Sequence, residues 1–110
     1  MTTIRMDWKT LELTAEGHAG GGPRGQNIIC AGISALTEAL LNQLLLENPA
    51  GTKYKIDEDR GIIRIRANPT EKSRARIRDY YRVIMTGLKA WEQAFPENVK
   101  TEEVNRDGTA

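Results

Sequence analysis

Residues 27–47 read NIICAGISALTEALLNQLLLE, and this stretch decides the fold. Asn27 is a good N-cap, because its side-chain oxygen can accept from backbone N–H groups two or three residues on. Asn48 and Pro49 end the helix after Glu47. Apolar side chains occupy most sides of its first half, which predicts a central helix packed against a sheet.

Alternating apolar and polar residues predict strands on both sides of this helix. One hairpin lies within residues 4–15 and a second within 53–66, where Asp59-Arg60-Gly61 supplies the turn. The predicted order so far is strand, strand, helix, strand, strand.

A long amphipathic helix is predicted from Thr70, because apolar residues then recur every three or four positions until Pro96. We expect its basic residues to be mainly solvated: Arg74, Arg76, Arg78 and Lys89. The predicted fold is a two-layer α+β domain of order ββαββα, with a small, mostly antiparallel or mixed sheet and two helices on one face.

The chain of 110 residues is long enough for one compact domain. We place this single domain at residues 1–95. Residues 96–110 are polar and have no periodic apolar face, so we expect a disordered tail.

Charge and hydropathy argue against several classes of partner. The 16 basic and 15 acidic residues nearly cancel, so we expect no direct nucleic-acid binding. Polar residues interrupt the longest apolar run, near residues 28–46, and the N-terminus has no continuous apolar stretch of the kind a secretory signal needs. We therefore expect no membrane span and a cytoplasmic location.

The single cysteine and the single histidine could form a catalytic pair. Cys30 falls at the third position of the predicted helix, where free backbone N–H groups and the helix dipole favour a thiolate. His18 can take the thiol proton and return it to a leaving amine. The same first-turn amides lie where an oxyanion would develop.

Simpler interpretations of both residues stay open. A lone cysteine among apolar residues is very often a core residue, and a histidine beside glycine is often a solvated turn residue. Because one cysteine excludes an intrachain disulfide and leaves too few metal ligands near it, we expect no metal and no cofactor.

Five of the nine residues from Gly17 to Gly25 are glycine, which predicts a flexible loop. Gly20, Gly22 and Gly25 match the spacing G-x-G-x-x-G of dinucleotide sites, but a hairpin follows the helix where a Rossmann unit needs a parallel strand. A phosphate-binding loop is also disfavoured, because Gln26 stands where its lysine is required.

The run Gly17-His18-Ala19, the glycine-rich loop and then residues 25–35, GQNIICAGISA, resemble the ribosomal-processing cysteine protease family Prp. The predicted order of elements is similar as well. The resemblance implies that His18 and Cys30 are the catalytic dyad of a cysteine endopeptidase.

The resemblance also implies a substrate, a loop movement and an assembly. The substrate would be a bacterial large-subunit ribosomal protein, from which a short N-terminal extension is removed. Flexible loop positions at Gly20, Gly21, Gly22 and Gly25 would admit the peptide, and the protein would act as a homodimer. The chain departs from the family at Asn27, where an aspartate is expected, and in the polar stretch after Pro96.

Two other functions stay open. The chain could be a phage or prophage homologue that processes a different protein. It could also be a non-enzymatic interaction module in which Cys30 is structural.

Overall fold

The computed structural model describes residues 1–17 and 28–106. His18, the loop glycines 20, 21, 22 and 25, and Asn27 lie outside the described residues. The elements, in chain order, are β1 (Thr2–Asp7), β2 (Glu12–Glu16), α1 (Ile28–Glu47), β3 (Lys53–Asp57), β4 (Ile62–Arg66), α2 (Arg74–Ala94) and β5 (Val99–Val104).

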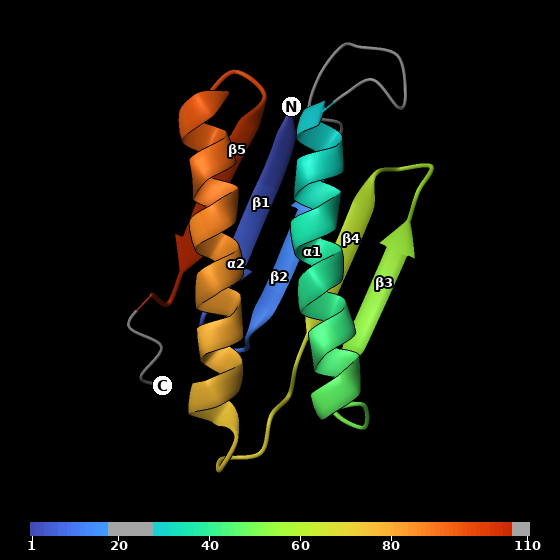
Figure 1. Ribbon diagram of the computed structural model, residues 1–110, viewed down its shortest axis with the longest axis vertical. Coiled ribbons are helices and arrows are strands. Elements are labelled where there is room, and N and C mark those ends of the chain that lie inside the picture. Colours follow the sequence, from blue (N-terminus) through green and yellow to red (C-terminus); the bar gives the residue numbers. More distant parts are fainter. Residues whose placement is uncertain (18–27, 107–110) are drawn as a thin grey trace.

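The strands form one sheet in the order β3-β4-β2-β1-β5 (Figure 1). All neighbouring pairs are antiparallel except β1 and β5, which are parallel. Both hairpins turn in the same way, because an aspartate at the end of the first strand accepts from the turn backbone: Asp7 from the amide of Lys9 at 3.0 Å, and Asp57 from that of Arg60 at 3.1 Å. The two predicted hairpins are therefore present.

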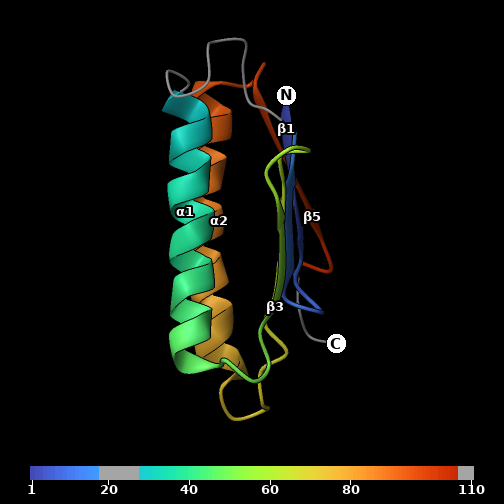
Figure 2. The ribbon, with the colours of Figure 1, turned by 90° about the vertical axis from the view of Figure 1, so that its right-hand side faces the viewer.

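Both helices cover the same face of the sheet (Figure 2), and the core lies between the two layers. Its fully buried side chains come from every layer: Ile4, Met6, Leu13 and Ile65 from strands, Leu40 and Leu44 from α1, and Ile77, Tyr81 and Leu88 from α2. This confirms the predicted two-layer α+β fold with a mixed sheet and two helices on one face.

Two glycines set the distance between α1 and α2. A β-carbon at Gly32 would lie 2.1 Å from Cζ2 of Trp91, and one at Gly87 would lie 3.1 Å from Cδ1 of Leu36. The helices therefore pack closely near the start of α1 and the end of α2.

The outer side of α1 is exposed and carries both apolar and polar residues. By length and composition alone, with a mean hydropathy of 1.6, α1 could cross a membrane, so its polar residues do not by themselves exclude a span. Its other side packs against the core through residues such as Ile33 and Leu40, as expected of a core helix.

The prediction of a disordered tail from residue 96 is wrong for β5. This strand pairs in parallel with β1, from Thr2 opposite Val99 to Asp7 opposite Val104. Periodicity missed it because only Val99 is fully buried, and the strand is held by backbone pairing and by polar contacts from α2. Glu92 of α2, for example, accepts from the backbone N–H of Thr101 at 2.9 Å.

Candidate active site around Cys30

Cys30 lies in the first turn of α1, two residues after the helix begins at Ile28. Its side chain is partly buried and packs against the hydrophobic core. No acidic residue lies in this first turn. The positive end of the helix dipole favours an anion at this position.

The start of α1 is fixed by its contact with the end of α2. Gly32, two residues after Cys30, packs directly against the ring of Trp91. Trp91 in turn stacks on Phe95, with ring centroids 5.8 Å apart. This aromatic pair supports the backbone that carries the cysteine.

Gly17, the residue before His18, is held at the end of β2. Its φ of +100° lies in the region that side chains disfavour, and a β-carbon would meet the carbonyl oxygen of Met1 at 2.4 Å. Its N–H donates to the carbonyl of Gly61 at 2.9 Å, and its own carbonyl accepts from the hydroxyl of Thr2 at 3.4 Å. Only glycine fits here without displacing the backbone.

Gly17 and Cys30 lie at the same end of the domain. The N–H of Thr2, next to Gly17, donates to the carbonyl of Asn98 at 2.8 Å, and that segment leads back to Phe95. Phe95 stacks on Trp91, which contacts the first turns of α1 (Figure 1). Gly17, directly before His18, and the start of α1, which carries Cys30, therefore lie at one end of the sheet.

The remaining predicted site residues cannot be placed against Cys30. His18, Gly20, Gly21, Gly22, Gly25 and Asn27 all lie outside the described residues. The roles of these residues stay predictions. Among residues 1–17 and 28–106, no group of three or more His, Cys, Asp and Glu side chains could hold a metal ion.

The sheet order bears on the dinucleotide interpretation of the glycine loop. β2, which precedes the loop, has β1 and β4 as its neighbours, and both are antiparallel to it. The strand after α1 pairs only with β4. Gly20, Gly22 and Gly25 are therefore not part of a parallel βαβ unit, which a dinucleotide site requires.

Comparison with known proteins identifies the family. The family model described as cysteine protease Prp matches residues 1–100. This chain belongs to the cysteine protease Prp family. The ribosomal processing cysteine protease Prp of Staphylococcus aureus strain Mu50 is 24% identical over 98 residues, which cover 89% of this chain and 91% of that protein.

Solved structures share the fold of this Prp family member. The S. aureus ribosomal processing protease Prp with a covalently linked product peptide has a TM-score of 0.80 at 20% identity, covering 94% of this chain and all of the other. The same protease with a substrate peptide has a TM-score of 0.76 at 19% identity over the same share of each chain. A Streptococcus mutans protein has a TM-score of 0.74 at 26% identity, covering 94% of this chain and 91% of that one.

Two supporting residues of the site were missed by sequence reasoning. Gly17 belongs to the Gly17-His18-Ala19 run, and its position directly before His18 is a signal, but the sequence does not show that its backbone requires glycine. Gly32 was a second signal, because glycine inside a helix costs about 1 kcal/mol relative to alanine and so points to a close contact.

Proposed function

We propose that this chain is a cysteine endopeptidase that removes a short N-terminal extension from a bacterial large-subunit ribosomal protein. Cys30 is the nucleophile, and His18 is the general base and acid. One observation carries the proposal: the only cysteine of a chain in a cysteine protease family lies in the first turn of a helix.

The chemistry runs in two steps. The Cys30 thiolate attacks the scissile carbonyl, His18 protonates the leaving amine, and the peptide bond breaks to leave a thioester on Cys30. Water then attacks the thioester and gives a proton to His18, and the C–S bond breaks to release the carboxylic acid and restore the Cys30 thiolate with protonated His18. The positive end of the α1 dipole favours the negative charge of the oxyanion in both steps.

The relatives of this chain support the substrate class. The S. aureus proteins are ribosomal processing proteases, and two of their structures contain a substrate or a product peptide. We extend this substrate to the present chain. A role in processing another protein, as in a phage homologue, is the alternative, and a cytoplasmic location is part of the proposal.

We further propose that the chain acts as a homodimer that pairs through the outer side of α1. A short exposed apolar stripe lies on the first half of this helix, formed by Ile28, Ala31, Ala35 and Ala39, and the exposed Asn42 and Gln43 follow it. Small residues at its centre allow two helices to approach closely. Beside it, Tyr54 and Ile56 of β3 are 53% and 48% exposed, which extends the apolar surface.

The test of the catalytic proposal is cleavage of a peptide that spans the extended N-terminus of the ribosomal protein, followed by mass spectrometry. The natural chain should cut one bond, and Cys30→Ala and His18→Ala should each abolish the cut while the circular dichroism spectrum is retained. Cys30→Ser is the matched variant that keeps the shape of the side chain but replaces the thiol.

Labelling with iodoacetamide separates the alternatives. A reactive Cys30 without cleavage would keep the chemistry and refute the ribosomal substrate. A folded chain with neither cleavage nor labelling would support a structural cysteine in an interaction module.

A further inference from the structure

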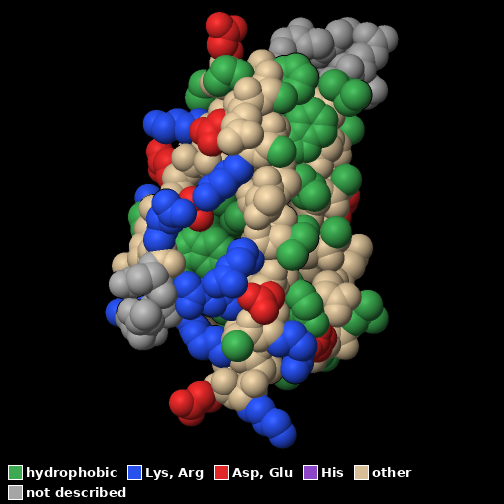
Figure 3. All heavy atoms as spheres, turned by 60° about the vertical axis from the view of Figure 1, so that its left-hand side comes forward, with side chains coloured by type: hydrophobic (Ala, Val, Ile, Leu, Met, Phe, Trp, Pro, Cys, Tyr) green, Lys and Arg blue, Asp and Glu red, His purple; other side chains and the backbone are tan. Residues whose placement is uncertain are grey.

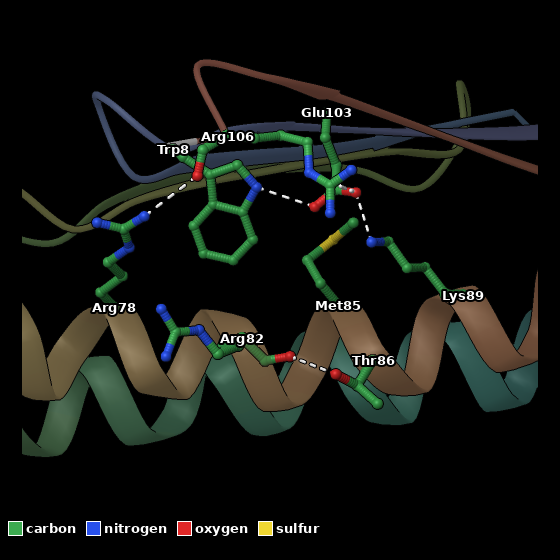
Figure 4. Close-up of a pocket in the computed structure, with 8 residues that line it drawn as sticks. All are labelled: Trp8, Arg78, Arg82, Met85, Thr86, Lys89, Glu103 and Arg106. Atoms are coloured by element: carbon green, nitrogen blue, oxygen red, sulfur yellow. Dashed lines mark hydrogen bonds and ion pairs between the residues drawn. The ribbon is translucent and has the colours of Figure 1, made fainter. Parts of the chain in front are cut away.

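A pocket of about 320 Å³ opens beside α2, on the side of this helix that faces away from α1 (Figure 3). Its lining comes from α2, from the turn after β1 and from the end of β5 (Figure 4): Trp8, Arg78, Arg82, Met85, Thr86, Lys89, Glu103 and Arg106. Because β5 completes this pocket, sequence reasoning that left the strand out could not find it.

A single carboxylate holds the basic side chains of the pocket together. Glu103 accepts from Nε1 of Trp8 at 2.9 Å and pairs with Nζ of Lys89 at 2.5 Å. Nε of Arg106 lies 3.8 Å from the same carboxylate. The guanidinium of Arg78 lies 5.7 Å from the centre of the Trp8 ring, in cation–π contact.

The pocket concentrates positive charge that the chain as a whole does not have. Four cationic side chains line it, against one carboxylate, and Asp79 outside the lining pairs with Arg82 at 3.2 Å. The formal net charge of the whole protein is only +1. The prediction of no nucleic-acid binding used the net charge, which averages over the whole surface. It therefore misses a local cluster of basic residues such as this pocket.

We propose that this pocket binds the phosphodiester backbone of RNA. Arg74, Arg78 and Arg82 follow one another at four-residue intervals, about 6 Å apart along the helix. Arg74 lies next to the pocket, since it donates to the carbonyls of Trp8 and Lys9. A row of arginine residues along one side of a helix suits a ligand whose negative charges repeat regularly.

The floor of the pocket argues against a protein partner. Trp8 and Met85 are only 6% and 2% exposed, so they offer no apolar cavity in which a partner residue could anchor. Interfaces with nucleic acid are more polar and more positively charged than those between proteins. A hollow also fits a protruding phosphate better than it fits the flat surface of a membrane.

The choice of RNA rests on the proposed function. The proposed substrate is a protein of the ribosome, a particle made largely of RNA. The pocket and α1 lie on opposite sides of α2, so a bound RNA strand would leave the helix that carries Cys30 accessible. The pocket would thus hold the enzyme on the particle while the cysteine reaches the extension.

The experiment is fluorescence anisotropy with a labelled, unstructured 20-nucleotide oligouridylate between 50 and 200 mM salt. For about three phosphate contacts, made by the pocket residues Arg78, Arg82 and Lys89, the slope of log K against log salt should be about −2, which lowers affinity by roughly 10- to 20-fold over this range. Arg82→Gln with Lys89→Gln removes two contacts and should reduce the slope to about −0.7.

The matched control is Lys53→Gln with Lys55→Gln, which removes two exposed positive charges from β3 at the far edge of the sheet. It should keep the slope of the natural protein. Equal losses in the two double variants, or no salt-dependent binding, would overturn the proposal. Tighter binding of a labelled polyglutamate than of the RNA at the same salt would overturn it in favour of an acidic protein segment.

Peptide cleavage separates this inference from the proposed function. Arg82→Gln with Lys89→Gln should cleave the free peptide at the natural rate, because neither residue lies near Cys30. If the natural chain did not cleave the peptide at all, the proposed function would fail, whereas RNA binding that requires Arg82 and Lys89 would stand.

Discussion

Gly32 of α1 lies against the indole ring of Trp91 of α2, so closely that a β-carbon at residue 32 would be 2.1 Å from Cζ2 and 2.5 Å from Cε2. These atoms belong to a ring that is itself stacked on Phe95 and cannot simply turn away. The contact therefore sets the distance between the two helices two residues after Cys30.

We predict that Gly32→Ala destabilises the protein by about 1 to 3 kcal/mol, the usual cost of overpacking, and lowers peptide cleavage. Urea unfolding and the cleavage assay measure the two effects. Gly87→Ala is the matched control in α2, where the nearest atom is a Leu36 methyl group at 3.1 Å that can shift. Alanine has a higher helix propensity than glycine, which should offset the cost of that shift and leave the stability of the Gly87→Ala variant nearly unchanged. Equal losses in both variants would contradict this account.

A second prediction concerns Gly17, which precedes His18. Gly17→Ala should cost about 2 to 4 kcal/mol, because alanine is strained at a φ of +100° and its β-carbon would meet the backbone of Met1. Gly61→Asn is the control, since asparagine tolerates the φ of +64° found there, and it should cost less than about 1 kcal/mol. Thermal unfolding of both variants measures the difference. A Gly17→Ala variant as stable as the natural chain would contradict the backbone geometry described here.

Periodicity was enough to predict both hairpins and both helices, because apolar residues recur at regular spacings in each, even in β3, where Tyr54 and Ile56 are exposed. It could not reveal β5, in which only Val99 is fully buried and polar pairs such as Glu92 with Thr101 hold the strand. The close helix contact at Gly32 was equally hidden, because its partner Trp91 is distant in sequence.

Only part of the candidate site could be predicted from the sequence. Cys30 at a helix start follows from the sequence and is present in the structure. Its pairing with His18 rests on family resemblance, because His18 lies outside the described residues. The basic pocket forms where three elements meet, namely the turn after β1, α2 and the end of β5. No local sequence pattern encodes this meeting.

The proposed dimer leads to a third prediction. Ala35→Glu places a charge at the centre of the apolar stripe on α1 and should weaken self-association at least tenfold, because a carboxylate would be buried without a partner. Val83→Glu is the control, because Val83 is 70% exposed but lies on α2. Sedimentation velocity over a range of protein concentrations measures both. A natural chain that stays monomeric, or equal effects of the two variants, would refute pairing through α1.

Acid should weaken the attachment of β5. Hydrogen bonds from Thr101 lower the pKa of Glu92. Burial raises the pKa of Glu103, but hydrogen bonds from Lys89 and Trp8 outweigh it, so this pKa is also lowered. A carboxyl whose pKa is lower in the folded than in the unfolded chain stabilises the fold above its ordinary pKa of about 4.3, and the stabilisation is lost as the pH falls through the folded value.

We therefore predict that the free energy of unfolding decreases steadily below about pH 4.5 and that Glu92→Gln with Glu103→Gln reduces this decrease. The double variant should be less stable than the natural chain at pH 7, where the carboxylates are charged, and should approach it at pH 3. Urea unfolding at several pH values, followed by tryptophan fluorescence because Trp8 contacts Glu103, gives both curves. Parallel curves for the two proteins would show that Glu92 and Glu103 do not cause the loss of stability at low pH.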